Sequence, residues 1–372
     1  MSGVGILCVM ERYFNIAGPC IPGEHYMLPA LDRLPEARRL VSRRQYFVIH
    51  APRQTGKTTA VKALVREINA KGEMVAIYCT LETLQNAADP EKASLAISDL
   101  ILDNFNAAFP TETTDAARQG APSSGGGVGL AIRSALRNLC RRAGKPLVVF
   151  FDEADCLSGN VLISFLRQLR DGYVNRDTIP FPASIALIGM LDVRDYKAQI
   201  RPDGESLGQI SPFNIISKDM LLRNFTAEEV AALYAQHTEE TGQKFASDVL
   251  DKVMDFTGGQ PWLVNALARE CIEEIHDFRY DETVTADDIE TAKETIIRRR
   301  PVHIDYLFWI AGRPDIKHVF QRMVSGKDAD TLHDMKAYKL LLNLGVLCET
   351  EEGLGFSNPI YREAWEKLYM EG

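Results

Sequence analysis

Short apolar runs alternate with longer amphipathic segments in the first half of the chain. The runs cover residues 46–49, 73–79, 147–151 and 184–189. Between them, residues 58–70, 90–109, 128–143 and 157–171 repeat apolar side chains at helical spacing. Alternating strands and helices predict right-handed crossovers, and therefore an α/β fold with a parallel sheet covered on both faces. We expect the last strand of this core at residues 212–216.

From Thr226 onward the pattern changes to helices alone, at about residues 226–240, 246–256, 261–276 and 285–298. Thr226 and Glu229 have the spacing of a capping box at the first of these helices. After about Pro301, further helices precede two short apolar strands around residues 352–353, which is the pattern of a winged helix. The pattern therefore predicts an α/β core with an N-terminal arm (1–220), a helical lid (221–299) and a winged-helix-like domain (300–372).

Composition adds limits rather than a function. The chain has 372 residues, of which 46% are hydrophobic and 25% charged, so it is long enough for two or three globular domains. Its net charge of -9 argues against a surface that is basic throughout. The 7 cysteines include no Cys-x-x-Cys pair, which favours buried thiols in a reducing cytoplasm over structural zinc. No apolar run reaches membrane-spanning length, and we expect a cytoplasmic protein.

The stretch from Ala51 to Thr59 links an apolar strand to a helix and carries the spacing of a P-loop, with alanine at the first position, where glycine is usual. Backbone amides and the helix dipole at such a place bind phosphate, while Lys57 would bridge the β- and γ-phosphates and Thr58 would hold Mg²⁺. The alternative is an ordinary glycine-containing turn. The nucleotide-binding residues predicted here are Pro52, Arg53, Gln54, Thr55, Gly56, Lys57, Thr58 and Thr59.

A second acidic motif follows the apolar run that ends in Asp152 and Glu153, and it looks like a Walker B element. Asp152 would bind Mg²⁺ through its waters, and Glu153 would orient or deprotonate the attacking water as the catalytic residue. By itself, an acidic pair after a strand is more often a solvated strand exit or a helix cap. Its combination with the P-loop favours the catalytic interpretation.

The strand at residues 184–189 is expected beside the Walker B strand, where ATPases of the AAA kind place a polar group that senses the γ-phosphate. The nearest candidates in this sequence are Asp192 and Arg194. Arg194 would equally suit a surface salt bridge.

The arm from Tyr13 to Pro29 is rich in glycine, proline and aromatic residues, which predicts an ordered extended segment. Because a P-loop grips phosphates only, flanking groups must hold the base, and Tyr26 and Met27 are apolar enough to face a purine. The alternative is an arm that only covers an edge of the sheet.

Taken together, these motifs resemble the STAND and origin-recognition branch of AAA-type P-loop ATPases. The chain is similar to bacterial AAA-like ATPases with a Tyr-Phe-Asn-x-x-Gly-Pro arm, a Pro-Arg-Gln-x-Gly-Lys-Thr loop and a terminal Asn-Pro-Ile-Tyr-Arg-Glu, here at residues 13–19, 52–58 and 358–363. The resemblance implies ATP or ADP with Mg²⁺ as ligands, and lid residues Gly259 and Pro261 in contact with the base. Related chains often continue into a PD-(D/E)XK nuclease-like domain, which we do not expect here, since this sequence ends at Gly372.

Winged helices can bind DNA through a basic recognition helix. The segment from Asp334 to Leu344 carries only Lys336 and Lys339 as positive groups, and the tip of the wing is acidic. These charges favour a protein partner or self-assembly over nucleic acid.

The sequence therefore predicts an ATP-dependent switch, in which ATP and Mg²⁺ lie between core and lid and slow hydrolysis by Glu153 resets their arrangement. One alternative is a nucleic-acid loader or motor resembling the origin-recognition ATPases. Another is a nucleotide-bound scaffold without turnover.

Overall fold

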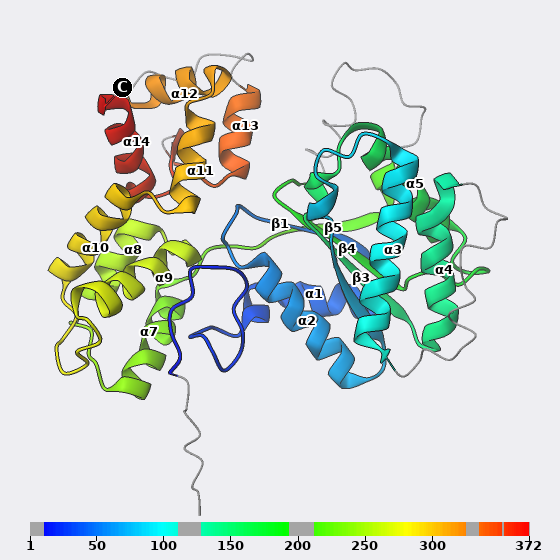
Figure 1. Ribbon diagram of the computed structural model, residues 1–372, viewed down its shortest axis with the longest axis horizontal. Helices are drawn as coiled ribbons and strands as arrows, with labels where there is room; N and C mark the ends of the chain where they lie inside the picture. The colour runs from blue at the N-terminus through cyan, green and yellow to red at the C-terminus, as the bar shows by residue number, and fades with distance from the viewer. Residues whose placement is uncertain (1–10, 111–127, 193–211, 325–334, 352, 372) are drawn as a thin grey trace, which may run out of the picture. The chain divides into compact units, whose positions relative to one another are not determined.

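The computed structural model of the protein describes residues 11–110, 128–192, 212–324, 335–351 and 353–371 (Figure 1). The chain forms two compact units. The core unit comprises Leu31–Ala51 and Ala60–Leu222, and the helical unit comprises Met1–Ala30, Pro52–Thr59 and Arg223–Gly372. The N-terminal arm and the P-loop segment therefore pack with the C-terminal half of the chain.

The core unit contains a parallel sheet whose described strands are ordered β2-β3-β4-β1-β5. These strands are β1 (Tyr46–His50), β2 (Val75–Thr80), β3 (Leu147–Asp152), β4 (Ser184–Gly189) and β5 (Ile216–Leu221). The prediction that β4 lies beside β3 is confirmed, since Val149 pairs with Ile185. Because all strands run in one direction, their carboxyl ends lie at one edge of the sheet, which in open α/β sheets is the edge that binds ligands.

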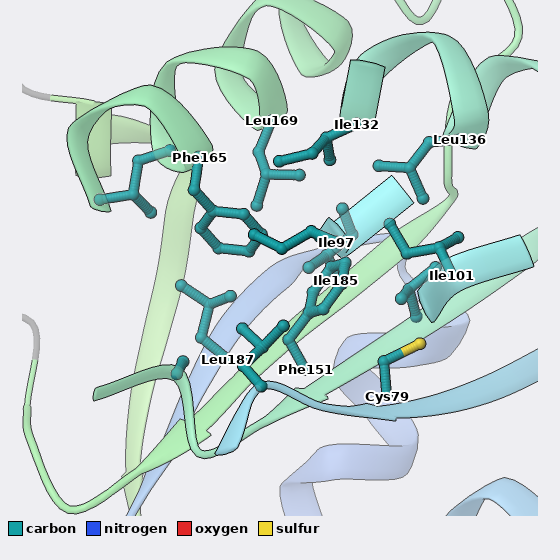
Figure 2. Packing of buried hydrophobic residues seen from close by; sticks show 14 of the residues in the cluster. Cys79, Ile97, Ile101, Ile132, Leu136, Phe151, Phe165, Leu169, Ile185 and Leu187 are labelled. Carbon is teal, nitrogen blue, oxygen red and sulfur yellow. The ribbon is translucent and has the colours of Figure 1, made fainter. Parts of the chain in front are cut away.

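Helices cover both faces of this sheet, as the apolar runs predict (Figure 1). Helices α3 (Pro90–Ala108), α4 (Ala131–Ala143) and α5 (Gly159–Val174) pack on one face, and α1 (Pro35–Ser42) and α2 (Lys57–Lys71) on the other. Figure 2 shows the first of these interfaces, where Phe151 of β3 meets Phe165 of α5 edge-to-face, with ring centroids 5.2 Å apart. Phe151 and Phe165 are almost fully buried, so this interface anchors the strand that ends in Asp152.

The prediction of a strand at residues 212–216 is wrong in its position. Pro212–Ile215 forms a 3-10 helix, and β5 begins only at Ile216. The apolar Ile215 packs into the core cluster beside α5, while β5 is an edge strand bonded to β1 and carries Lys218 and Asp219. Charged side chains are usual on edge strands, because they prevent pairing with other chains, and they break the apolar run that a central strand shows.

The helical unit follows the predicted order of helices. It contains α7 (Ala227–Thr241), α8 (Val249–Thr257), α9 (Pro261–Arg269) and α10 (Ala286–Arg299). Thr226 and Glu229 form the predicted capping box, and Pro261 occupies the first position of α9. One difference is that α9 continues as a π-helix, Glu270–Ile275, for which the sequence offers no signal.

The remaining elements of this unit are α11 (Val302–Ala311), α12 (Pro314–Val324), α13 (Met335–Asn343) and α14 (Pro359–Glu371), with an antiparallel hairpin of β6 (Leu347–Thr350) and β7 (Gly353–Phe356). The hairpin lies where two apolar strands were predicted. Lys293 of α10, which is 5% exposed, forms an ion pair with Glu363 of α14 at 3.0 Å and so ties the C-terminal helix to the lid helices. In the described parts of the chain, no helix is long and apolar enough to span a membrane.

Candidate nucleotide-binding site

The P-loop segment connects β1 to α2, as expected of a phosphate-binding loop. Ala51 still belongs to the strand pairing, since its N–H donates to Gly189 O of β4 at 3.2 Å. Its backbone is not in the left-handed region, whereas Gly56 has φ +85° and Gln54 has φ +62°. Glycine is therefore needed at position 56 and not at position 51, which explains how alanine is accommodated there.

Within the loop, the carbonyl of Pro52 accepts two hydrogen bonds. Thr55 Oγ1 and Lys57 Nζ each donate to Pro52 O at 2.8 Å. Lys57 is 7% exposed and Thr55 is 1% exposed, so both side chains are held inside the loop. The ammonium group thus lies at the start of α2, where the amides of the first helical turn have no carbonyl partner within their own helix. This combination of a buried cation and first-turn amides suits an anion such as a phosphate.

Three consecutive residues of the loop contact three different parts of the helical unit. Pro52 lies so close to Gly345 that a Cβ placed on that glycine would be 2.6 Å from the proline ring. The guanidinium of Arg53 lies over the ring of Tyr306 of α11, 4.5 Å from its centroid. The next carbonyl, Gln54 O, accepts a hydrogen bond from Gln260 Nε2 at 3.3 Å. The conformation of the loop is therefore linked to the start of α9, to α11 and to the Gly345 segment of the same unit.

Gly259 and Pro261, which the resemblance predicts as lid residues, are both buried in the joint between α8 and α9. A Cβ on Gly259, whose φ is +70°, would lie 2.1 Å from Phe225 O, so only glycine fits there. Pro261 is buried at the start of α9. The residue between them, Gln260, caps α9 by accepting from Leu263 N at 2.6 Å. Gln260 thus forms hydrogen bonds with both α9 and the P-loop. Its position immediately before a proline is a sequence signal for the N-cap.

The arm is fixed in the helical unit by contacts of Ile16, Cys20 and Tyr26. Trp262 Nε1 donates to Ile16 O at 2.8 Å, and Cys20 N donates to Thr59 Oγ1 at 3.1 Å. Tyr26 is 1% exposed, and its hydroxyl lies 3.2 Å from His237 Nδ1. The suggestion that Tyr26 faces a purine is therefore not supported, because the ring is used for packing against α7.

The acidic motif lies at the carboxyl end of β3 in the core unit. Asp152 is 1% exposed, and its two oxygens accept from Tyr78 OH at 2.7 Å and from Glu153 N at 3.0 Å. Tyr78 was missed in the sequence, although it lies on β2, the strand paired with β3. Both donors fix the orientation of the carboxylate.

Glu153 has an uncommon backbone conformation for a residue with a side chain, φ +54° and ψ +40°. Such left-handed residues cost free energy and cluster at functional sites. The next acidic side chain along the chain, Asp155, accepts from Met190 N at 3.4 Å and so fixes the turn that follows β4. Asp192, one of the two sensor candidates, is buried shortly after that turn, and Arg194 lies outside the described residues.

The acidic and hydroxyl side chains also define which metal would fit. Within the residues that the structure describes, no group of three or more His, Cys, Asp or Glu side chains is placed to hold a metal ion by itself. Thr58 and Asp152 offer one hydroxyl and one carboxylate, oxygen donors of the kind that Mg²⁺ prefers when water and phosphate supply its other ligands. Taken one by one, these two side chains have the donor chemistry that suits Mg²⁺ delivered with a nucleotide.

The fold is that of the P-loop ATPases: the described residues form a five-stranded parallel sheet of this order, with a loop of P-loop spacing after β1 and an acidic pair after β3. Among solved structures, the Walker-type ATPase PABY2304 of Pyrococcus abyssi is similar over 95% of this chain and 99% of its own, with a TM-score of 0.61 and 16% identity. The ORC2 protein of Aeropyrum pernix, in its ADPNP-ADP complexes, is similar over 98% and 99%, with a TM-score of 0.53 and 17% identity. No protein-family model matches the sequence, and no curated protein does.

Proposed function

We propose that this protein binds ATP with Mg²⁺ at the P-loop, hydrolyses it slowly, and acts as a nucleotide-controlled conformational or assembly switch. The observation that supports a switch most directly is the contact of Pro52, Arg53 and Gln54 with the C-terminal half of the chain. A loop that only bound phosphate would need no such contacts. In this protein, a nucleotide that displaces Pro52, Arg53 or Gln54 would also change the contact of that residue with a lid or C-terminal element.

The proposed roles follow from the chemistry of each side chain. Lys57 supplies a positive charge for the β- and γ-phosphate oxygens, and to do so its ammonium exchanges Pro52 O for phosphate. Thr58 and Asp152 would hold Mg²⁺, which stabilises negative charge on the phosphates when bound. Glu153 orients or deprotonates the attacking water, a contribution of roughly a hundredfold or more in rate. Gly259 and Pro261 are proposed to border the base, and Asp192 and Arg194 remain candidate sensors.

The switch itself depends on differential binding. A nucleotide shifts an equilibrium between two arrangements only as far as it binds one of them more tightly. Taking Lys57 away from Pro52 O removes one of the two bonds that hold the Pro52 peptide in place, and Pro52 packs on Gly345. Phosphate binding would therefore alter the position of the loop against the C-terminal segment.

Within this proposal, we place the chain in the STAND and origin-recognition-like branch, with residues 300–372 as a winged-helix-like domain and a protein partner or a second copy as the output. The hairpin of β6 and β7 supports the winged helix. The few positive groups near α13 do not favour DNA as that partner.

The test is calorimetry with Mg-ATP on the parent protein and on Lys57→Ala, with phosphate release measured in parallel. The parent should bind and release phosphate slowly. Lys57→Ala should lose most of the binding while keeping its far-ultraviolet circular dichroism, with Lys71→Ala at the far end of the same helix as the control. Unchanged ATP affinity in Lys57→Ala would remove the nucleotide site from this loop. Adding duplex DNA to the same assays tests the loader alternative, which predicts salt-sensitive DNA binding coupled to ATP.

A further inference from the structure

A pocket within the helical unit has a volume of about 300 Å³, and no P-loop residue is among those that line it. Its lining includes the buried residues Phe14 and Tyr26. Three more accessible aromatic residues, Tyr13, Phe278 and Tyr280, also line it. The volume is at the lower end of the range for small-molecule sites, and an aromatic lining of this kind is typical of ligand pockets.

The charged groups around the pocket leave an excess of negative charge. Arg12 is paired with Glu240 at 2.6 Å, and Arg269 is paired with Glu273 at 2.8 Å. Glu11 also lines the pocket and accepts from Tyr280 OH at 3.2 Å. In the part of the chain that the structure describes, no ion pair joins Glu11 to a cation. The two arginines are thus neutralised, and Glu11 contributes an additional negative charge beside the aromatic rings.

The ionisation of the lining groups reflects this excess. Burial, followed by the negative charges of Glu11, Glu240 and Glu273, raises the pKa of Tyr280 to about 12. The pKa of Tyr26 is raised well above its usual range, by burial first and by Glu240 second. Anionic groups near these hydroxyls disfavour a further negative charge, and they favour a positive one.

The backbone around the pocket is costly to form. The π-helix Glu270–Ile275 supplies Ile272 and Glu273 to the lining, and π-helical turns occur frequently at functional sites. Asp277 and Phe278 follow with φ of +47° and +58°, conformations that non-glycine residues rarely adopt. The result is that the ring of Phe278 remains 53% exposed at the pocket. These residues end the π-helix, since Phe278 N donates to Ile272 O at 3.0 Å, and this leaves Phe278 beside the pocket.

We propose that this pocket binds an organic cation, with a guanidinium or a methylated ammonium group held against the rings of Tyr13, Phe278 and Tyr280 and balanced by Glu11. Aromatic faces attract cations through their quadrupole, and a neighbouring carboxylate adds charge attraction. An anionic ligand would gain less attraction from Arg12 and Arg269, because both are already paired. A neutral apolar ligand would gain no charge attraction from Glu11.

The pocket also has a short connection to the P-loop through the arm. Tyr13 and Phe14 line the pocket, Ile16 O is bonded to Trp262, and Cys20 N is bonded to Thr59 at the start of α2. A cation held by Tyr13 would therefore raise nucleotide affinity through these contacts, and nucleotide would raise cation affinity by the same factor. This coupling rests on the proposed nucleotide function, whereas cation binding itself does not.

The experiment titrates the nucleotide-free full chain with butylguanidinium and, separately, with choline, by calorimetry. The neutral isosteres butylurea and 3,3-dimethylbutanol are the matched controls. Binding of at least one cation, at least about tenfold tighter than its isostere, is expected from charge recognition. Whichever of the two cations binds identifies the head group. Equal binding of cation and isostere, or no binding of either cation at millimolar concentration, would overturn the proposal.

Two variants place the ligand in the pocket. Glu11→Gln, which keeps the shape of the side chain, and Phe278→Ala, at an exposed position, should each weaken cation binding roughly three- to thirtyfold. Glu274→Gln is the control, because this exposed acid belongs to the same π-helix but pairs with Arg299 and does not line the pocket. If Glu274→Gln weakens binding as much as Glu11→Gln does, the site lies elsewhere and the assignment fails. Repeating the titration with Lys57→Ala separates the two proposals, since that variant should keep cation binding and lose only the nucleotide effect.

Discussion

The guanidinium of Arg53 and the ring of Tyr306 form a cation–π contact that joins the P-loop to helix α11, with 4.5 Å between the guanidinium carbon and the ring centroid. Because Arg53 is the second residue of the predicted nucleotide-binding stretch, this contact couples the loop to a helix of the C-terminal part. The pKa of His303, one turn earlier on α11, is lowered by burial and then by the charge of Arg53.

The first prediction concerns that contact. Tyr306→Leu removes the aromatic face and should destabilise the helical unit by about 0.5–1 kcal/mol, the usual value for a partly exposed cation–π pair. Denaturant unfolding measures the loss, and hydrogen exchange should show faster exchange of the loop amides. Tyr306→Phe keeps the ring and should match the parent, and a similar loss in both variants would mean that the hydroxyl matters instead.

The second prediction separates the two bonds made by Gln260. Gln260→Ala removes the cap of α9 and the bond to Gln54 O, so it should cost about 1 kcal/mol in stability and also weaken ATP binding roughly three- to tenfold. Thr226→Ala removes a cap of the same kind from α7 and has no bond to the loop. Calorimetry and thermal unfolding on both variants distinguish the effects. Equal ATP affinities would show that Gln260 acts only as a cap.

The third prediction tests the catalytic role of Glu153. Glu153→Gln should bind ATP like the parent and lose roughly a hundredfold or more in phosphate release, because the amide cannot accept the proton of the attacking water. The substitution keeps the length of the side chain. It also leaves a non-glycine residue in the left-handed backbone conformation, so the backbone strain is the same in both proteins. Turnover equal to that of the parent would exclude Glu153 from the mechanism.

The fourth prediction uses two glycines that share a left-handed backbone and differ in their surroundings. Gly242 has φ +81° and nothing within 4 Å of an added Cβ, so Gly242→Ala should cost about 1–2 kcal/mol from backbone strain alone. Gly259→Ala adds a clash with Phe225 O to the same strain and should cost at least about 3 kcal/mol. Urea unfolding of both variants gives the comparison, and similar losses would contradict the close approach of the backbone at Gly259.

The fifth prediction concerns pH. Burial, and then the charge of Arg53, lowers the pKa of His303 from 6.5 to about 4, and its Nε2 lies 2.7 Å from Tyr361 OH. The unfolded chain therefore takes up a proton below pH 6.5 that the folded chain does not accept until about pH 4. The stability that His303 contributes is complete above pH 6.5 and is lost as the pH falls to about 4. The loss should be on the order of 3 kcal/mol.

Urea unfolding of the parent and of His303→Gln at a series of pH values isolates this effect, because other titrating groups are common to both proteins. The difference between the two stability curves should appear between pH 6.5 and 4. A difference that does not vary with pH would mean that His303 titrates normally.

The sequence predicted the parts of the fold that rest on continuous apolar runs. The strand that ends in Asp152 is buried on both faces, so its pattern is unambiguous. β5 was misplaced because an edge strand with Lys218 and Asp219 lacks that pattern. Lys57 lies at the start of a helix, and Asp152 and Glu153 lie at the end of a strand, as the motifs predict, while their roles in a site stay a prediction.

Other site contacts were outside the reach of sequence reasoning because they join residues far apart in the chain. Tyr78 reaches Asp152 from a neighbouring strand, and Gln260 reaches Gln54 across 206 positions of sequence. No local spacing encodes such pairs. Tyr26 shows the reverse case, since an aromatic residue in a glycine- and proline-rich arm suits both a ligand surface and a small core, and only its burial decides between them.

Ala51 also bears on how related chains can be detected. A search that requires glycine at the first position of the loop would pass over this sequence, although the backbone at Ala51 lies outside the left-handed region and pairs like a strand residue. Gly56 is the position where the torsion angles restrict the amino acid. A search profile for this loop should therefore weight each position by the torsion angles it must adopt, and it would then retain divergent members that a fixed-letter pattern discards.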